Sequence, residues 1–565
     1  MAWRLKGAQH LLRPLSIMKY CIDKKTGTYA ETLEAIGVAD TLREVGFTGV
    51  TITDEGSKFR IHSPTDPPPE RWNAGVTPGY PYIWKKGKEP QKPALPWVVD
   101  YEAGRENRDA ARKAGNKSKG KLRDQDIEVL PEVEPEIDTA AILESMRKGW
   151  DSDRSLAKWV AAHQQEAVDW IRFRVGLGGV PPAEIPDVSN TQILNPISGK
   201  GVSAGKTEIR SAGSIPRQIV DPFSEWMKLR GLWDGMLLFR SGDDFKFFVM
   251  EPAELRADSI RMVRAELVKL PLWGGVRLDI FAALECARVL IQHSDLVQGL
   301  SGWCPILHRT PRTIVAGLRQ AYFKSLGTAA ALMNDAFLPL PDWFVIRDAT
   351  DAGAYLNIID EAIGTGGCLK SLQEKNSDDG FVLQQYREWL LTGDLADLLN
   401  FHYFFALHLI QRSSRHDWAR PFGTENLSTL LTRTYEEEYQ VTGIIEDPGF
   451  QSVARALRNA TIYALTLPNS KREVRFGIAQ KWKQKMKAGD DELAAAIAEF
   501  VQDYNWETAH KLKGKGHAIT TEDLGSLLRL IPGRAELVGS LLLAYGYARA
   551  PKVETAQPEE AASQA

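Results

Sequence analysis

The strongest constraint on the fold lies in the C-terminal part of the chain, where apolar side chains recur at helical spacing in several short segments. After Asp490, a good N-cap, the following apolar residues are three or four positions apart and share one helix face: Leu493, Ile497, Phe500, Val501 and Tyr504. Another pattern opens with the cap sequence at 520–523, stops at 532–533, and is followed by a mostly apolar helix over 534–548. Because each stripe must be buried against other helices, we predict a C-terminal helical bundle.

The segment before Asp490 predicts a helix with a positive outer face. Residues 471–487 contain seven basic residues and one acidic residue, and Val474, Ile478, Trp482 and Met486 line one side of the helix. A solvated surface is the ordinary explanation of a charged helix face. Here only one carboxylate lies within the segment to neutralise the cations, so binding of phosphates would relieve their mutual repulsion. We therefore expect nucleic-acid contacts from Arg475, Lys481, Lys483, Lys485 and Lys487.

The chain has 565 residues, which is too long for one hydrophobic core. We predict an α+β fold, with short strands and hairpins in the N-terminal and middle regions and a mainly helical second half. The expected domains are a mixed N-terminal region over 1–140, a mixed to helical central region over 141–420, the basic bundle over 421–550 and a disordered tail over 551–565.

Within this frame, local patterns predict individual elements. A helix carrying Leu33 and Leu42 should precede a strand at 49–53, and further helices should lie within 142–175. Apolar runs on either side of 241–244 indicate a β-hairpin, and long helical patterns are expected from 279 to 416. Four tryptophans are expected to be core or interface residues: Trp273, Trp303, Trp343 and Trp389.

A second basic region lies in a proline- and aromatic-rich stretch of the N-terminal domain. Between residues 85 and 123 there are twelve basic and five acidic residues, whereas 124–138 contains seven acidic residues and no basic one. The two stretches either neutralise each other within the domain, or the cations contact nucleic acid. In the second case Lys117, Lys119 and Lys121 are the candidate contacts.

The loop at 195–207 is the second candidate site. It resembles a phosphate-binding P-loop, but Lys200 occupies a position where that motif requires glycine, and no strand-like run leads into it, so we reject a nucleotide site. An ordinary exposed connector remains possible. Alternatively, its glycines let backbone N–H groups approach phosphates or base edges, beside two lysines. The candidate residues are Asn195, Gly199, Lys200, Gly201 and Lys206.

The sequence predicts neither catalysis nor a bound metal or cofactor. The dipeptide His416-Asp417 matches part of an HD nuclease motif, but one such pair is expected by chance, and that class needs further ligands on other helices. His402 and His408 are six positions apart, which places them on different faces of a helix. No HExxH, GxSxG or nucleophilic cysteine signature occurs.

Composition indicates a soluble, cytoplasmic protein. No apolar run approaches the ~18 residues that a membrane span requires, so no membrane partner is expected. The four cysteines, Cys21, Cys286, Cys304 and Cys368, are far apart in sequence, which is typical of a reducing compartment. Net charge is −3, so nucleic acid would have to be bound by local patches.

Four C-terminal segments resemble the large subunit of type I CRISPR interference complexes, nearest to the Myxococcus-type branch close to subtype I-B. The segments are residues 450–461, 472–480, 520–524 and 541–549. The likeness is best over residues 420–550 and looser over the loop at 195–206.

The resemblance implies a non-catalytic subunit at one end of the crRNA-bound Cascade complex, beside its backbone and small subunits. Such a protein recognises a short PAM in duplex DNA, promotes R-loop formation, covers the displaced strand and recruits a helicase-nuclease, while base pairing recognises the rest of the target. The family commonly recognises the PAM with a glycine-bearing loop and a lysine, which Gly199, Lys200, Gly201 and Lys206 match here. The alternatives are a divergent HD-type nuclease and a helical scaffold that binds an acidic protein.

Overall fold

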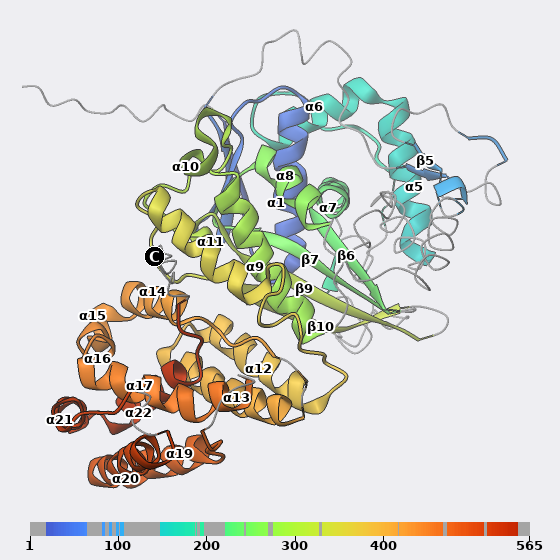
Figure 1. Cartoon of the computed structure of the whole chain (residues 1–565). Coiled ribbons are helices and arrows are strands. Elements are labelled where there is room, and N and C mark those ends of the chain that lie inside the picture. The colour runs from blue at the N-terminus through green and yellow to red at the C-terminus, as the bar shows by residue number, and fades with distance from the viewer. Residues whose placement is uncertain are drawn as a thin grey trace, which may run out of the picture. The chain divides into compact units, whose positions relative to one another are not determined.

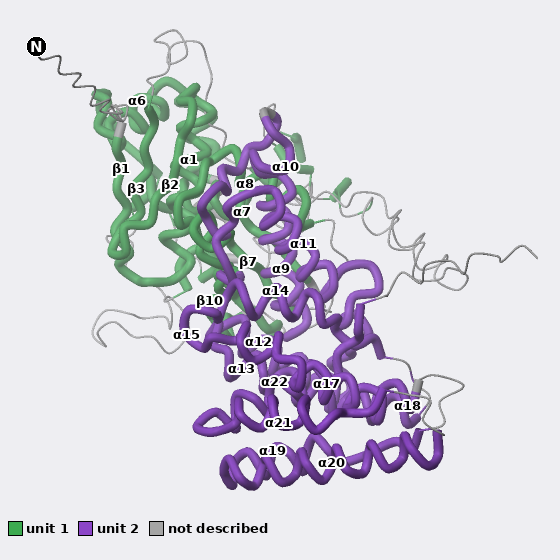
Figure 2. The backbone as a smooth tube through the Cα atoms, turned by 60° about the vertical axis from the view of Figure 1, so that its left-hand side comes forward, with its two compact units in different colours: residues 1–273, 311–340 green, residues 274–310, 341–565 purple. Residues whose placement is uncertain are grey.

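The structure is a computed structural model that falls into two compact units (Figure 2). Unit 1 comprises residues 1–273 and 311–340, and unit 2 comprises 274–310 and 341–565. The residues that the structure describes are 18–64, 82–84, 90–92, 98–100, 102–104, 106, 147–186, 188, 192–196, 221–241, 244–268, 275–326, 330–415, 417, 419–466, 472–512 and 517–551.

This division differs from the predicted domain limits at residues 140 and 420. The predicted central region is shared between both units, because residues 315–339 pair with strands of unit 1. Near residue 420 the chain continues within one unit, where Gly423 N–H donates a hydrogen bond to Glu361 Oε1 (2.8 Å). The predicted disordered tail lies outside the described residues beyond Pro551.

The first sheet of unit 1 has four antiparallel strands in the order β1-β3-β2-β8, of which Figure 2 labels β1, β3 and β2. They are β1 (Met18–Asp23), β2 (Thr51–Asp54), β3 (Lys58–Ser63) and β8 (Glu254–Arg256). Helix α1 (Tyr29–Glu44) precedes β2, as the sequence predicts, and begins after Thr28, whose side chain accepts a hydrogen bond from Ala30 N–H.

The second sheet is also antiparallel, in the order β10-β9-β7-β6, and all four of these strands are labelled in Figure 1. The predicted hairpin is confirmed as β6 (Met236–Ser241) and β7 (Asp244–Pro252). The expectation of helix throughout 279–416 is wrong over β9 (Val315–Ser325) and β10 (Ala330–Pro339). Val315, Leu318 and Ala321 have helical spacing, but pairing of β9 with β7 and β10 satisfies its backbone and buries these side chains in the sheet. A short parallel pair is formed by β4 (Tyr82–Trp84) and β5 (Val98–Asp100).

Two glycines allow α1 and α7 (Pro222–Gly235) to cross closely. A Cβ on Gly37 would lie 1.8 Å from Met227 O, and one on Gly231 would lie 1.8 Å from Leu33 O. The crossing helices therefore tolerate no side chain at either position. Further helices in the described part of unit 1 include α5 (Arg147–Ala162), α6 (Gln164–Arg174) and α8 (Ala257–Leu267).

Unit 2 consists mainly of helices, which confirms the α+β class with a helical second half. Its helices before residue 440 are α9 (Val276–Gln292), α10 (Asp295–Gln298), α11 (Ala349–Ile363), α12 (Ser377–Thr392), α13 (Leu395–Ser414), α14 (Thr424–Thr434) and α15 (Glu436–Tyr439). Those after it are α16 (Thr442–Ile445), α17 (Pro448–Ala460), α18 (Ile462–Thr466), α19 (Ile478–Ala488), α20 (Asp490–His510), α21 (Thr521–Leu530) and α22 (Ala535–Gly546). Trp343 and Trp389 are buried and stack with ring centroids 5.6 Å apart, as expected of core residues.

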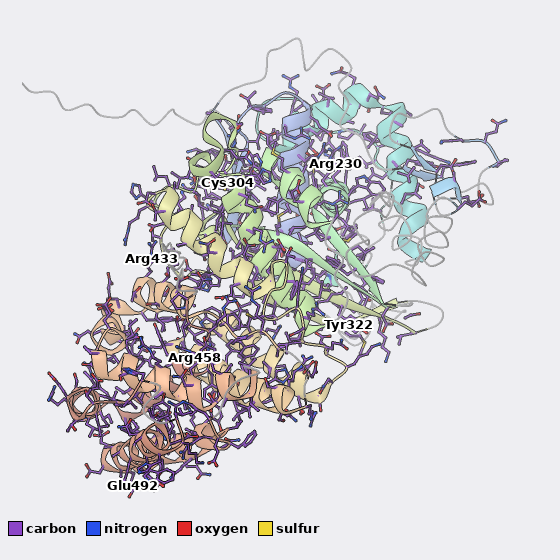
Figure 3. The ribbon with its side chains drawn as sticks, viewed as in Figure 1. Arg230, Cys304, Tyr322, Arg433, Arg458 and Glu492 are labelled. Carbon is purple, nitrogen blue, oxygen red and sulfur yellow. The ribbon has the colours of Figure 1, made fainter. Side chains whose placement is uncertain are left out.

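Helix α17 is packed against α21 and α22 in the C-terminal bundle. Arg458 of α17, labelled in Figure 3, is buried. It donates hydrogen bonds to the carbonyl oxygens of Tyr545 (2.7 Å) and Ala548 at the end of α22. The predicted cap at Thr520 is confirmed, since its side chain and that of Asp523 form a reciprocal capping box. In the described part of the chain, no helix is long and apolar enough to cross a membrane.

Candidate nucleic-acid interface

Asn195, at the start of the candidate loop, is buried and fixes that start to α7. Its side-chain Nδ2 donates a hydrogen bond to Glu225 Oε2 (2.8 Å), and Lys228 Nζ donates one to its Oδ1 (2.7 Å). Lys228 Nζ also lies 2.9 Å from Glu225 Oε1, which closes a three-residue cluster. Burial raises the pKa of Glu225, and the nearby Lys228 opposes that rise.

This geometry corrects the expectation that Asn195 contacts nucleic acid. Both ends of its amide bind partners within the protein, and the residue is only 7% exposed. Asn195 is therefore a structural residue that ties the described segment 192–196 to α7. The other predicted loop residues, Gly199, Lys200, Gly201 and Lys206, lie outside the described residues, as do Lys117, Lys119 and Lys121.

The predicted basic face on α19 is matched by carboxylates of neighbouring helices. The ion pairs are Arg475–Asp503 (2.9 Å), Lys481–Glu499 (2.6 Å), Lys485–Glu492 (2.5 Å) and Lys483–Glu536 (3.8 Å). The hydrogen bond and charge of Lys485 lower the pKa of Glu492. Lys487 is exposed and forms no ion pair with any residue in the described ranges.

The charge balance of this helix pair contradicts the expectation of a positive face without neutralising carboxylates. Residues 472–512 contain seven basic residues and seven acidic residues, so their formal net charge is zero with histidine neutral. Residues 471–487 by themselves lack most of these carboxylates, because α20 supplies them. Cations that pair with exposed carboxylates can still exchange them for phosphates, because such surface pairs contribute only about 0–1 kcal/mol each.

Two exposed aromatic side chains that the sequence patterns did not single out lie in the turn before α19 and on α20. Phe476 is 60% exposed and Trp506 is 56% exposed. Trp506 stacks on His510 with ring centroids 4.8 Å apart, and its helical spacing places it on the face of α20 that carries Asp503. The sequence signal for Trp506 is its position outside the apolar stripe of α20, which predicts an exposed side chain. Exposed aromatic rings can stack on nucleobases.

The HD dipeptide gains no support as a metal site. His416 lies outside the described residues, and Asp417 forms an ion pair with Arg412 (2.7 Å). Burial lowers the pKa of His402 to about 4, and this side chain lies among aromatic residues away from His408. Within the described ranges, no group of three or more His, Cys, Asp or Glu side chains has the geometry to hold a metal ion.

Comparison with known proteins gives no further assignment. No protein-family model matches the chain, and no curated protein matches it in sequence. A functional proposal for this chain therefore depends on its own residues and on the resemblance of its C-terminal segments.

Proposed function

We propose that this chain is the non-catalytic large subunit of a crRNA-guided type I CRISPR surveillance complex. In this role it binds the PAM in duplex DNA, promotes R-loop formation and recruits a helicase-nuclease. Its partners are the crRNA, the target duplex with its displaced strand, and the backbone and small subunits of the complex, in the cytoplasm.

The observation that carries the proposal is the convergence of the four resembling segments in one bundle. Residues 450–461 form most of α17, which packs on α21, whose cap is 520–524, and on α22, which includes most of 541–549. The 472–480 segment joins them through the hydrogen bond from Arg475 N–H to Ala460 O (2.8 Å). The resemblance therefore concerns positions that build a common core, which supports a shared bundle architecture.

The cluster at Asn195 supports PAM recognition by the loop that follows it. A loop can hold its glycines and lysines near a base edge only if its start is fixed, because ordering a free loop costs conformational entropy. The Asn195–Glu225–Lys228 cluster fixes this start on α7. We assign PAM contacts to Lys200 and Lys206, with Gly199 and Gly201 allowing close backbone approach.

The bundle has a weaker electrostatic role in this proposal than its lysines alone suggest. Because residues 472–512 are neutral overall, long-range attraction of a polyanion by this face is small. Contacts with the displaced strand would instead combine local phosphate contacts, Lys487 first among them, with stacking on exposed aromatics.

Co-purification tests the proposal. The tagged chain is co-expressed with a CRISPR array and the neighbouring genes of its own source, and we expect it to be recovered with repeated backbone subunits and an RNA of one defined length. A variant with both Lys200→Ala and Lys206→Ala should retain that RNA but lose PAM-dependent opening of a target duplex. Recovery of the chain without RNA would reject the proposal, and metal-dependent DNA cleavage by the isolated chain would favour the nuclease alternative.

A further inference from the structure

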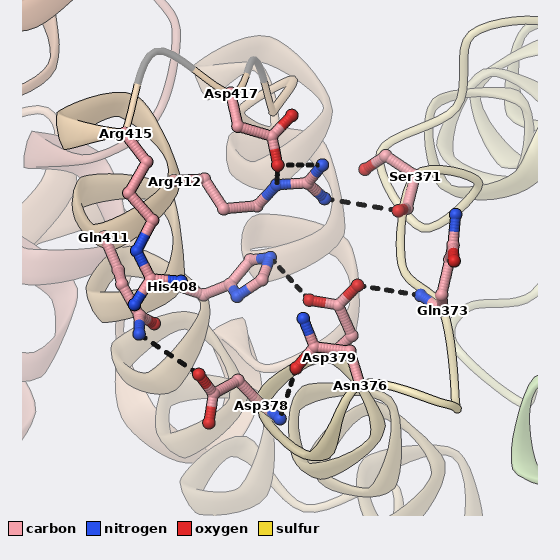
Figure 4. A pocket seen from close by; sticks show the side chains of 10 residues that line it. All are labelled: Ser371, Gln373, Asn376, Asp378, Asp379, His408, Gln411, Arg412, Arg415 and Asp417. Atoms are coloured by element: carbon pink, nitrogen blue, oxygen red, sulfur yellow. Dashed lines mark hydrogen bonds and ion pairs between the residues drawn. The ribbon is translucent and has the colours of Figure 1, made fainter.

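A polar pocket lies within unit 2 between the N-terminal end of α12 and the C-terminal end of α13 (Figure 4). Its volume is about 200 Å³, below the ~300 Å³ at which pockets for drug-sized ligands begin. It is formed by the 371–376 loop, the first turn of α12 and residues 408–417. A ligand of this pocket must therefore be a small group rather than a large molecule.

The floor of the pocket carries buried polar atoms without hydrogen bonds. His408 and Asp379 are each 4% exposed, and His408 Nε2 lies 3.4 Å from Asp379 Oδ1. Asp379 Oδ2 accepts a hydrogen bond from Gln373 N–H (2.9 Å), whereas Asp379 Oδ1 and both ring nitrogens of His408 have no hydrogen-bond partner in the described part of the chain. Leaving buried polar groups unsatisfied is unfavourable, so a ligand that satisfies their hydrogen bonds recovers that free energy on binding.

The charges around the pocket disfavour an anionic ligand. Burial lowers the pKa of His408, with the carboxylate of Asp379 opposing the shift. With this imidazole neutral, the lining residues contribute three carboxylates and two guanidinium groups. Arg412 is already paired with Asp417 (2.7 Å), and Asp378 accepts a hydrogen bond from Gln411 (3.1 Å). A free phosphate would meet more carboxylates than guanidinium groups, so an anion is a poor fit.

We infer that this pocket binds the hydrogen-bonding edge of a single unpaired nucleobase that carries an amino group, with cytosine the best fit by size. Asp379 Oδ1, which lies 3.4 Å from His408 Nε2 but accepts no hydrogen bond from it, would accept one from the amino group, the usual pairing of an aspartate with cytosine N4. A neutral imidazole has one donor and one acceptor nitrogen, so His408 can donate to the adjacent ring nitrogen of the base. The planar guanidinium of Arg415, in the lining, can stack on the base or contact its carbonyl oxygen.

The inference extends the proposed function and rests on it in one respect: the displaced strand of the R-loop would supply the unpaired base. The pocket chemistry itself can be tested on the isolated chain, without guide RNA or partner subunits. If co-purification with RNA failed, nucleoside binding by the pocket could still be observed. If nucleoside binding failed, the proposed complex would not be contradicted.

The test compares cytidine with uridine, which have nearly the same shape but exchange an amino donor for a carbonyl acceptor. We expect cytidine to bind the full chain at least tenfold more tightly than uridine, measured by NMR titration, because a site built for a donor rejects an analogue without it. Asp379→Asn keeps an acceptor for Gln373 N–H and adds a donor, so it should invert the preference towards uridine. Asp397→Asn, on α13 outside the pocket, is the matched control and should preserve the wild-type preference.

Three results would overturn the inference. They are equal binding of cytidine and uridine, no saturable nucleoside binding in the millimolar range, and displacement of cytidine by inorganic phosphate, which would indicate an anion site. Thermal unfolding of Asp379→Asn alongside wild type separates a lost preference from a lost fold. If that variant unfolds early, His408→Gln replaces it, and an undiminished preference for cytidine there would equally reject the role of the pair.

Discussion

Lys481 of α19 and Glu499 of α20 form an ion pair with 2.6 Å between Nζ and Oε2, on a surface where both side chains are about half exposed. Through this pair and its neighbours, cations of α19 are neutralised by carboxylates of α20, and residues 472–512 together carry no net charge. Any contact of the bundle with nucleic acid therefore requires lysines to leave carboxylate partners, which reduces the net gain from each phosphate.

The Lys481–Glu499 pair predicts a charge-swap result. Lys481→Glu should lower the free energy of unfolding by less than about 1 kcal/mol, because an exposed pair is weak and is replaced by screened repulsion. Combining it with Glu499→Lys should restore most of the loss in a urea-unfolding double-mutant cycle. Additive effects of the two changes would show that this contact contributes nothing to stability.

Lys487 should differ from its paired neighbours in binding nucleic acid. Because it has no ion pair among the described residues, Lys487→Ala should reduce the salt dependence of R-loop binding by about one unit of slope, as expected for one lost phosphate contact. Lys485→Ala should change the slope less. In the wild-type chain Lys485 can contact a phosphate only by leaving Glu492, and the freed carboxylate offsets part of that contact's contribution to the slope. The measurement is complex affinity at several salt concentrations, and equal effects would contradict the distinction.

Two lysines of the candidate loop should carry PAM affinity. Lys200→Ala and Lys206→Ala should each weaken binding of PAM-containing duplex by roughly 1–3 kcal/mol if they contact base edges or adjacent phosphates. The comparison is competition with a PAM-mutated duplex. Equal losses on both duplexes would reduce the role of these lysines to backbone contact, and no loss would make the loop an ordinary connector.

The α1–α7 crossing should not tolerate a methyl group. Gly231→Ala would place its Cβ 1.8 Å from Leu33 O, so the helices must separate, and we expect a loss of about 1–3 kcal/mol or more in stability. Gly353→Ala in α11 is the matched control, because its Cβ would meet nothing within 4 Å and alanine favours helix by roughly 0.5–1 kcal/mol. The two variants should shift the unfolding midpoint in opposite directions, and a harmless Gly231→Ala would contradict the packing.

Asp234 should give unit 1 a pH-dependent stability. Burial and the nearby charge of Asp40 raise the pKa of Asp234 from 3.8 to about 7. A raised carboxyl pKa means that the folded state binds the proton more tightly, so this contribution is greatest below about pH 4 and is lost as the pH rises to about 7. Asp234→Asn should flatten stability across that range, measured by thermal unfolding, whereas Asp258→Asn, at a partly exposed carboxylate of α8, should not.

Local chemistry along the chain was sufficient for several elements. The β6–β7 hairpin follows from apolar runs split by a turn, and the start of α21 follows from the cap formed by Thr520 and Asp523. These features depend on residues within a few positions of one another, so a short window contains the interactions that decide them.

Tertiary structure decided what depends on distant partners. Strand β9 has apolar spacing compatible with a helix, and only pairing with β7, about seventy residues earlier, makes it a strand. The sequence places Asn195 in a candidate nucleic-acid loop, whereas in the fold Glu225 and Lys228 of α7 bind both ends of its amide. Asp379 and His408 face one pocket because α12 and α13 pack side by side. Sequence determined local conformation through short-range sterics and hydrogen bonds. The fold decided which charges are paired with an opposite charge and which polar groups lack a hydrogen-bond partner, because these depend on contacts that no local pattern encodes.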